Sequence, residues 1–421
     1  MLKSFERWFA AGKNLACRRR DVWRPWDRGE LACAESRSTP LLRKPADAPG
    51  ERRPRRQRVP VAGTRDELLA RGRARFGPMA TALLPTTVVG SYPQPAWLID
   101  REALGTHVPR IRSPGMWRVS PAHLEQSQDE GVRLAVGDME NAGIDIVTDG
   151  EIRRESYSNY FVTALDGIDG DRPGSITTRS GQPAAVPRVV GPIGRPQPVG
   201  TRDIAFLRSV TSRPIKATVP GPFTMSQQAQ DDYYGDARAL ALDLADAVNL
   251  ELRDLVAAGA DIVQLDEPWL TARPEQAREF AIEAIDRALD GIESITALHV
   301  CLGYAAAVRA KPSAYPYLAE LEACAVQQIS IEAAEARLDL SILKRFPTKT
   351  MIVGVLDLAD PDVDSVESIV QRTHAALTWI DPERLVLAPD CGMKYLPRDT
   401  AFAKLNAMVE AASAVRSALV G

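Results

Sequence analysis

Four residues of this sequence have the types and spacing of a metal site. His299 and Cys301 are two positions apart in an apolar segment, and on a β-strand this spacing points both side chains to one face. Glu332 and Cys391 end two later apolar segments. An imidazole, two thiolates and a carboxylate form a tetrahedral zinc set that is too soft for magnesium or calcium. On spacing alone the alternative stays open that each residue is buried in the core.

Further polar residues end apolar segments in the same way. Polar side chains at the end of an apolar strand cost free energy on burial unless they are paired or used in function. Residues of this kind from several different strands therefore indicate a shared site. Besides the four possible metal ligands, they are Ser91, Glu151, Asp266 and Asp357.

The elements that must position these residues are short, β-branched apolar segments, which we interpret as strands. They span residues 86–91, 144–149, 214–219, 261–266, 294–301, 328–333, 350–357 and 385–391. Amphipathic segments of helical length lie between most of them, including 237–258 and 399–418. Residues 142–147 and 258–263 resemble each other, and each predicts a helix end, a glycine stop and a buried strand.

Eight strands that alternate with helices predict an α/β fold, a (β/α)8 TIM barrel with loop insertions. A doubly wound open sheet is the alternative, but no glycine-rich phosphate turn follows the first strand. In a barrel the carboxyl ends of the strands form one face, where catalytic groups collect. The polar residues that end the predicted strands should therefore meet there.

Charge divides the chain into two parts. Of 421 residues, 45% are hydrophobic and 25% charged, and the net charge is −3. Residues 1–78 hold 20 Lys and Arg against 9 Asp and Glu, a balance of +11, which leaves −14 for residues 79–421. No apolar run is long enough for a membrane span. Five scattered cysteines predict a reduced, cytoplasmic protein rather than a disulfide scaffold.

Residues 1–78 are expected to form a basic, irregular extension, and residues 79–421 the barrel domain. Arginine clusters and prolines favour an extended, solvated chain in the first part. It can be a basic arm for nucleic acid or anionic lipid, a targeting peptide, or upstream sequence ahead of a true start at Met79. Disorder or a start at Met79 is our preferred interpretation, and we expect no nucleic-acid or membrane partner.

Seven motifs of the acidic part resemble those of one enzyme family. They are TTVVGSYPQP, DIVTDGEIRRESYSNYF, VQLDEP, HVC, ISIEAA, GVLDL and APDCGMK, in this order. Over about residues 84–415 the chain resembles the C-terminal catalytic barrel of cobalamin-independent methionine synthases. The resemblance implies that His299, Cys301, Glu332 and Cys391 bind zinc, which accepts the thiol of the substrate. Zinc removes the proton of a thiol and leaves a nucleophilic sulfur.

The same resemblance implies how the thiol substrate, homocysteine, is held. Glu151 and Asp266 would bind its ammonium group, and Gly90 and Ser91 its carboxylate through a backbone N–H and a hydroxyl. The alternatives are that Glu151 pairs with Arg153 or Arg154, and that Asp266 caps the following turn.

Three departures from the family concern the methyl donor. No second N-terminal barrel is present, no tryptophan occurs in GPFTMSQQAQ, and Asp357 is not followed by the family's histidine two residues on. Folate N5 leaves poorly unless it is protonated, so a proton donor is needed. Asp357 is our candidate, with Asp360 and Tyr395 as alternatives. The donor itself can be a methyl-folate or a carrier protein, for example one that carries a corrinoid.

Related activities stay open at this stage. The chain also resembles the single-barrel epoxyalkane:coenzyme M transferases, in which a zinc-bound thiolate opens an epoxide. Coenzyme M carries a sulfonate and no ammonium, so Glu151 and Asp266 favour homocysteine and methyl transfer. A metal-free barrel of the uroporphyrinogen decarboxylase kind would not need the His, Cys, Glu and Cys set. Cys324 is expected to be a buried residue outside this site.

Overall fold

The computed structural model describes residues 83–104, 111–156, 158–177, 183–303, 311 and 314–420. The predicted basic extension, residues 1–78, lies outside the described residues.

Six parallel strands form one continuous sheet, in the order β3-β5-β6-β7-β8-β9. Neighbours in this order are mostly also neighbours in the sequence, as expected for repeated strand–helix units. The register places Asp266 of β5 beside His299 of β6, and His299 beside Ser330 of β7. The strands are β3 (Lys216–Pro220), β5 (Ile262–Asp266), β6 (Ile295–Val300), β7 (Gln328–Ile331), β8 (Thr350–Leu356) and β9 (Leu385–Pro389).

The first two predicted strands complete the ring, although each is present only as short bridges. Thr86 bridges Leu387 of β9, Thr87 bridges Ile146, and Val147 bridges Ile215, the residue just before β3. All these bridges are parallel. Eight parallel segments therefore follow one another around the barrel, and the predicted (β/α)8 fold is confirmed.

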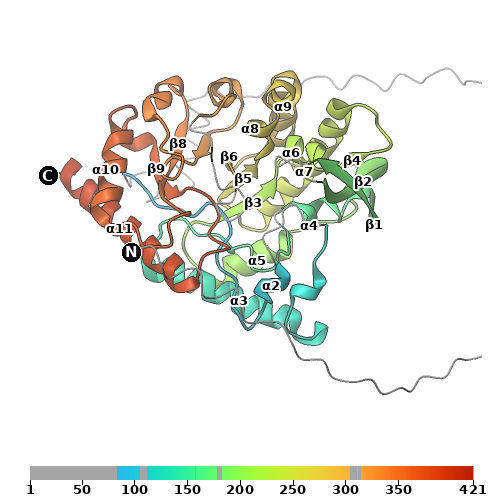
Figure 1. Cartoon of the computed structure of the whole chain (residues 1–421), viewed down its shortest axis with the longest axis horizontal. Helices are drawn as coiled ribbons and strands as arrows, with labels where there is room; N and C mark the ends of the chain where they lie inside the picture. The colour runs from blue at the N-terminus through green and yellow to red at the C-terminus, as the bar shows by residue number, and fades with distance from the viewer. Residues whose placement is uncertain are drawn as a thin grey trace, which may run out of the picture. The chain divides into compact units, whose positions relative to one another are not determined.

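Helices follow most of the strands and pack outside the ring (Figure 1). The predicted helices 237–258 and 399–418 are α7 (Ala237–Ala257) and α11 (Arg398–Val420). The predicted glycine stops are present, since Gly143 and Gly259 have φ of +85° and +111°. The other helices are α2 (Arg101–Leu104), η2 (Pro114–Met116), α3 (Pro121–Ala142), α4 (Asn159–Val162), α5 (Thr201–Val210), α6 (Pro222–Gln227), α8 (Trp269–Ala272), α9 (Pro274–Leu289), η3 (Leu318–Ala323), η4 (Leu340–Arg345), α10 (Val366–Leu377) and η5 (Pro382–Arg384).

An antiparallel hairpin between the second strand segment and β3 is the main insertion. It pairs β1 (Asp166–Thr177) with β2 (Pro183–Gly194), and the short β4 (Gln230–Asp231) adds to β2 in parallel. The three strands lie together on the side away from α10 and α11 (Figure 1). Loop insertions into the barrel were predicted, but these three strands were not.

The interior of the ring is mainly apolar at the level of Ile262, where Lys216 of β3 is the exception. The side chains that fill it come from many strands of the barrel, as in other barrels of this type. They are Val89, Ile146, Ile262, Ala297, Ile352, Val386 and Ala388. A larger apolar cluster lies outside the ring and includes residues of the strands and of α3, α7, α9 and α11. Polar residues near the ends of the strands therefore stand on a rigid, packed base.

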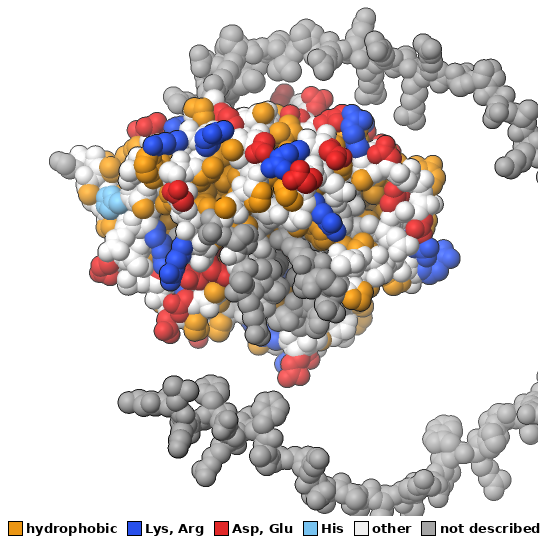
Figure 2. Space-filling view, turned by 45° about the horizontal axis from the view of Figure 1, so that its top comes forward, with side chains coloured by type: hydrophobic (Ala, Val, Ile, Leu, Met, Phe, Trp, Pro, Cys, Tyr) orange, Lys and Arg blue, Asp and Glu red, His pale blue; other side chains and the backbone are white. Residues whose placement is uncertain are grey.

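Basic and acidic side chains are interspersed with apolar and neutral ones on the face seen in Figure 2. Among the described residues, none of the helices has the length and hydropathy needed to cross a membrane.

Candidate metal centre and substrate site

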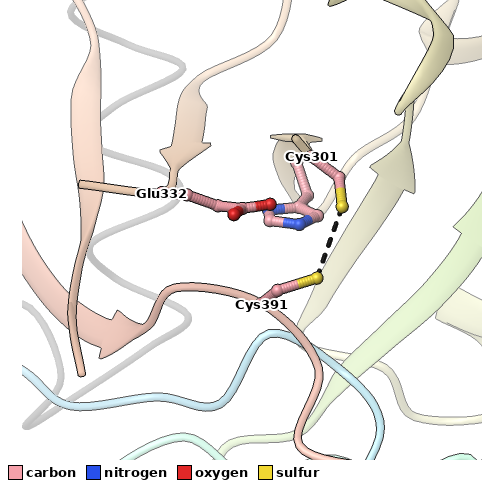
Figure 3. Close-up of side chains that lie close together, drawn as sticks. Cys301, Glu332 and Cys391 are labelled. Atoms are coloured by element: carbon pink, nitrogen blue, oxygen red, sulfur yellow. Dashed lines mark hydrogen bonds between the residues drawn. The ribbon is translucent and has the colours of Figure 1, made fainter. Parts of the chain in front are cut away.

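The four predicted ligands meet in one buried cluster. One donor atom from each of His299, Cys301, Glu332 and Cys391 lies within 4.8 Å of all the others, and all four residues are buried. The sulfurs of Cys301 and Cys391 are 3.3 Å apart and share a hydrogen bond. Cys301, Glu332 and Cys391 point toward one another from three separate segments (Figure 3). The predicted convergence at the carboxyl ends of the strands is therefore found.

The strands and their loops set this convergence. His299 lies in β6 and Cys301 directly after it, so the two-residue period turns both side chains inward. Glu332 directly follows β7. Cys391 follows Asp390, whose carboxylate accepts hydrogen bonds of 2.7–3.0 Å from three successive backbone N–H groups, those of residues 333–335. Asp390 thereby ties the segment of Cys391 to the segment of Glu332.

Gly354 of β8 is needed for the approach of Asp390. A Cβ atom at Gly354 would lie 2.2 Å from Oδ1 of Asp390, which is far too close. Burial raises the pKa of Asp390 to about 6, while the backbone donors oppose that rise.

The histidine is oriented for an external ligand. Its Nδ1 lies 2.9 Å from Oγ of Ser330, on the neighbouring strand. Its Nε2 is buried and has no hydrogen-bond partner among the described residues. Buried polar atoms nearly always have a partner, so an unpaired ring nitrogen beside two thiols indicates a missing ligand.

The thiol pair favours a cation. The hydrogen bond from Cys391, helped by His299 and Lys311, lowers the pKa of Cys301 well below its ordinary value. The same hydrogen bond and burial raise the pKa of Cys391. Burial, followed by the charge of Cys301, raises the pKa of Glu332 well above its ordinary value. For all three groups to be anions at this distance, a positive ion must lie among them, and the donor set therefore fits a tetrahedral metal such as zinc.

Glu151, which was predicted to bind the ammonium group of the substrate, has a constrained backbone conformation. Its φ is +53°, and its backbone N–H donates to Asp149 at 3.0 Å. Its Oε1 accepts from Oγ1 of Thr218 at 3.1 Å and pairs with Arg154 at 3.4 Å, so the predicted alternative of an ion pair is also real. Oε2 is buried without a partner among the residues described. One oxygen of Glu151 is therefore held and the other is available.

Gly90 lets this carboxylate approach the barrel strand. A Cβ atom at Gly90 would lie 2.6 Å from Oε1 of Glu151. The next residue, Ser91, is buried, and within the described part of the chain its hydroxyl has no partner. The backbone carbonyl of Ser91 accepts from the N–H of Met393, two residues after Cys391. Ser91 therefore lies close to the loop that carries a predicted metal ligand.

Asp266 connects the two sites. It is in register with His299 on the adjacent strand, so both side chains point inward at the same level. Its Oδ1 accepts a hydrogen bond from Nε2 of Gln264 at 2.8 Å. This partner lies on the same strand and not in the following turn, which Asp266 was expected to cap in the alternative interpretation. Burial raises the pKa of Asp266 to about 6; His299 opposes this rise and Glu151 adds to it. Asp266 therefore interacts electrostatically with both His299 of the metal cluster and Glu151.

Asp357 is half-buried in the turn after β8. Its Oδ1 accepts from the backbone N–H groups of Ala359 and Asp360 at 2.9 and 3.3 Å. Asp360 is exposed and Tyr395 half-buried. A role for Asp357 in proton transfer stays a prediction.

Lys311 and Tyr315 lie close to the site and were not foreseen, whereas Arg154 was expected only as a possible partner of Glu151. Arg154 is buried, donates twice to Thr218 and stacks over the ring of Tyr160 at 4.5 Å. Lys311 forms an ion pair with Glu332, and the hydroxyl of Tyr315 accepts from the backbone N–H of Glu332 at 2.8 Å. The contacts of Arg154 with Thr218 and Tyr160 were not predicted. The sequence carries no signal for Lys311 or Tyr315.

Comparisons with known proteins agree on one family. Residues 84–414 match the family described as cobalamin-independent synthase, catalytic domain. A methionine synthase of Sulfurisphaera tokodaii is 33% identical over 338 residues, which are 80% of this chain and 94% of that protein. A methionine synthase of Sulfolobus acidocaldarius is 33% identical over 339 residues, again 80% and 94%.

Solved structures give the same result. A B12-independent methionine synthase from Shewanella sp. W3-18-1, in complex with selenomethionine, is 32% identical with a TM-score of 0.75. The match covers 80% of this chain and 99% of that one. A putative vitamin-B12-independent methionine synthase from Listeria monocytogenes has a TM-score of 0.60 at 20% identity, which supports the fold alone. Nearly the whole length of these relatives is matched, so they have no room for a second barrel outside the match.

Proposed function

This chain belongs to the cobalamin-independent methionine synthase family and is a methyltransferase, and we propose that it uses zinc to methylate the sulfur of homocysteine. The observation that carries the proposal is a group of unpaired buried atoms at the barrel mouth. They are Nε2 of His299, Oε2 of Glu151 and Oγ of Ser91, which lack partners among the described residues. Nε2 of His299 fits the metal ion that takes the thiol, Oε2 of Glu151 fits an ammonium group, and Oγ of Ser91 fits a carboxylate.

His299, Cys301, Glu332 and Cys391 would hold the zinc ion, since they fit it in donor type and mutual distance. Bound zinc supplies the positive charge that keeps a thiol deprotonated at neutral pH.

The other residues would bind and orient the amino acid. Glu151 and Asp266 present two carboxylates to the ammonium group, and Ser91 offers a hydroxyl donor to the carboxylate. Arg154 and Thr218 hold one oxygen of Glu151, so that the free oxygen has a defined direction. Because Glu151 and Ser91 are buried, these contacts form away from bulk water and are strong.

The same residues disfavour coenzyme M as the substrate. Its sulfonate would face Glu151 and Asp266, and buried like charges repel each other. The relatives from Sulfurisphaera tokodaii and Sulfolobus acidocaldarius are also named methionine synthases. The methyl donor and its proton donor stay predictions, with a methyl-folate or a carrier protein for the first and Asp357 for the second.

The test is zinc analysis combined with a methyl-transfer assay. Purified wild-type protein should contain about one zinc per chain and form methionine from homocysteine and a methyl-folate, but no thioether from coenzyme M and an epoxide. Cys391→Ala should lower zinc affinity and activity at least about tenfold. Cys324→Ala is the matched control, because Cys324 is equally buried but bonds to Asp286 outside the cluster.

Two results would contradict the proposal. Wild-type protein without zinc would exclude the metal role, and zinc-loaded protein that alkylates coenzyme M but not homocysteine would exclude the acceptor. A methyl carrier protein is tested in the same assay as a second donor.

A further inference from the structure

Lys311 is a buried cation that the proposed reaction has not used. Its ammonium group forms ion pairs with the carboxylates of Glu332 and Glu335, the latter at 2.6 Å. The side chains of Lys311 and Glu332 are 1% and 0% exposed, so this pair is shielded from water and salt. Burying a lysine this deeply costs free energy, which the two carboxylate partners offset, so we treat Lys311 as part of the site.

Glu332 differs from the other three candidate ligands in how its donor atoms are occupied. Its Oε1 accepts from the backbone N–H of Leu302 at 2.6 Å, and its Oε2 accepts from Lys311. Both carboxylate oxygens therefore have hydrogen-bond donors from the protein. Nε2 of His299, in contrast, has no partner in the described part of the chain.

Glu335 keeps the lysine in place. It is paired with Lys311 from the segment after β7, and the backbone N–H of Glu335 donates to Asp390 at 2.7 Å. Lys311 can therefore release Glu332 only partly, because its second carboxylate partner stays fixed beside it.

From this arrangement we propose that Lys311 is a positioning residue that competes with the metal for the carboxylate of Glu332. His299, Cys301 and Cys391 are then the firm ligands, and the fourth position stays exchangeable for the substrate thiol. Catalytic zinc sites need three protein ligands and such an open position. The inference rests on the proposed zinc-dependent function. It adds a reason why Glu332 does not permanently occupy the fourth position of the metal.

The direction of the effect follows from charge. The ammonium group repels a divalent cation and attracts the carboxylate that the cation needs. Removing the charge of Lys311 should therefore strengthen metal binding and weaken the ability of a thiol to take the fourth position.

The experiment compares wild type, Lys311→Met and Lys311→Arg, each as the full chain. Zinc affinity is measured without thiol, by competition with a chromophoric chelator. Lys311→Met should bind zinc at least about tenfold more tightly than wild type, whereas Lys311→Arg keeps the charge and should stay close to wild type. In the zinc-loaded proteins, the KM for homocysteine should rise at least about tenfold in Lys311→Met and little in Lys311→Arg.

The outcomes separate the two proposals. If wild-type protein binds no zinc, the proposed function fails. If wild-type protein binds zinc but a folded Lys311→Met binds it equally or more weakly, Lys311 does not compete for Glu332 and the inference is wrong. Should Lys311→Met fail to fold, Lys311→Gln replaces it, because glutamine also removes the charge, and zinc affinity should rise in the same direction. Unchanged or weaker zinc affinity in folded Lys311→Gln would overturn the inference.

Discussion

Glu151 adopts a left-handed backbone conformation, with φ of +53°, directly after Gly150 at +67°. For a residue with a Cβ atom this conformation costs about 1 kcal/mol, and such strain often occurs at functional sites. The bond from its N–H to Asp149 and the contacts of its carboxylate with Thr218 and Arg154 offset this cost. The strain directs one carboxylate oxygen into the barrel mouth, where it can act as an ammonium ligand.

Glu151→Gln tests this role, because it removes the charge and keeps the shape. We expect the KM for homocysteine to rise about 10- to 100-fold, as expected when one charge-assisted hydrogen bond is lost. Zinc content should not change, since Glu151 is not in the metal cluster. Steady-state kinetics at saturating methyl donor gives the KM.

The matched control is Glu130→Gln, a glutamate paired with Arg133 on the exposed surface of α3. Its KM should equal that of wild type. An unchanged KM in Glu151→Gln would show that the ammonium group of homocysteine binds elsewhere.

At the scale of elements, strand β3 carries one residue into the barrel that apolar packing does not explain. Lys216 is 1% exposed, and its Nζ has no hydrogen-bond partner among the described residues. It is in register with Ile262, a member of the apolar interior cluster. Burial lowers the pKa of Lys216 to about 7, against a smaller opposing effect of Asp266. The amine therefore reduces the stability of the barrel near neutral pH.

The pH dependence of this cost has a definite sign. Below about pH 7 the amine is protonated in both the folded and the unfolded chain, and the cost of burying its charge is complete. Between about 7 and 10.5 the unfolded chain binds more protons than the folded one, so the free energy of unfolding rises with pH.

Lys216→Met should remove this dependence. At pH 6 we expect the variant to be about 2–4 kcal/mol more stable than wild type, and the difference should shrink toward pH 10. Urea unfolding at both pH values measures it. Lys349→Met is the contrasting variant: the amine of Lys349 is also buried but donates to the carbonyls of Cys324 and Val326, so its loss should cost about 1–3 kcal/mol. Equal destabilisation by both substitutions would contradict the argument.

At the scale of the whole barrel, closure depends on a contact between the first strand segment and the last helix. Oδ2 of Asp145 accepts from the N–H and the hydroxyl of Thr86 at 2.8 and 2.9 Å, and from Arg416 of α11 at 2.7 Å. Arg416 also donates to the carbonyls of Leu83 and Leu84, each at 2.8 Å. Since the first two strand segments have only bridges, these side chains supply much of what holds them in the ring.

Asp145→Ala should therefore destabilise the protein without affecting the site. We expect the free energy of unfolding to fall by about 2–3 kcal/mol, with zinc content unchanged in the folded protein. Asp290→Ala, at an exposed aspartate after α9, should stay within about 0.5 kcal/mol of wild type. Equal stability of the two variants in urea would show that the strand bridges suffice for closure.

Much of this barrel follows from patterns that are local in the chain. Short apolar runs, glycine stops such as Gly143, and the two-residue spacing of His299 and Cys301 depend on neighbouring residues alone. Parallel strands end on one face, so the meeting of Glu332 and Cys391 with them was also predictable. The short bridges of the first two strand segments were not, because bridge length depends on partners elsewhere in the ring.

Other features arise only from contacts between distant residues. The pairing of β1 with β2 contains register irregularities. Asp390 reaches the loop after β7 because Gly354 has no side chain that would block it. Lys311 forms an ion pair with Glu332, which follows a different strand, β7. Periodicity reports which face of its own element a residue occupies, so the four candidate metal ligands were predictable. The pairings of Lys311 and Asp390 depend on packing across elements and were not predictable.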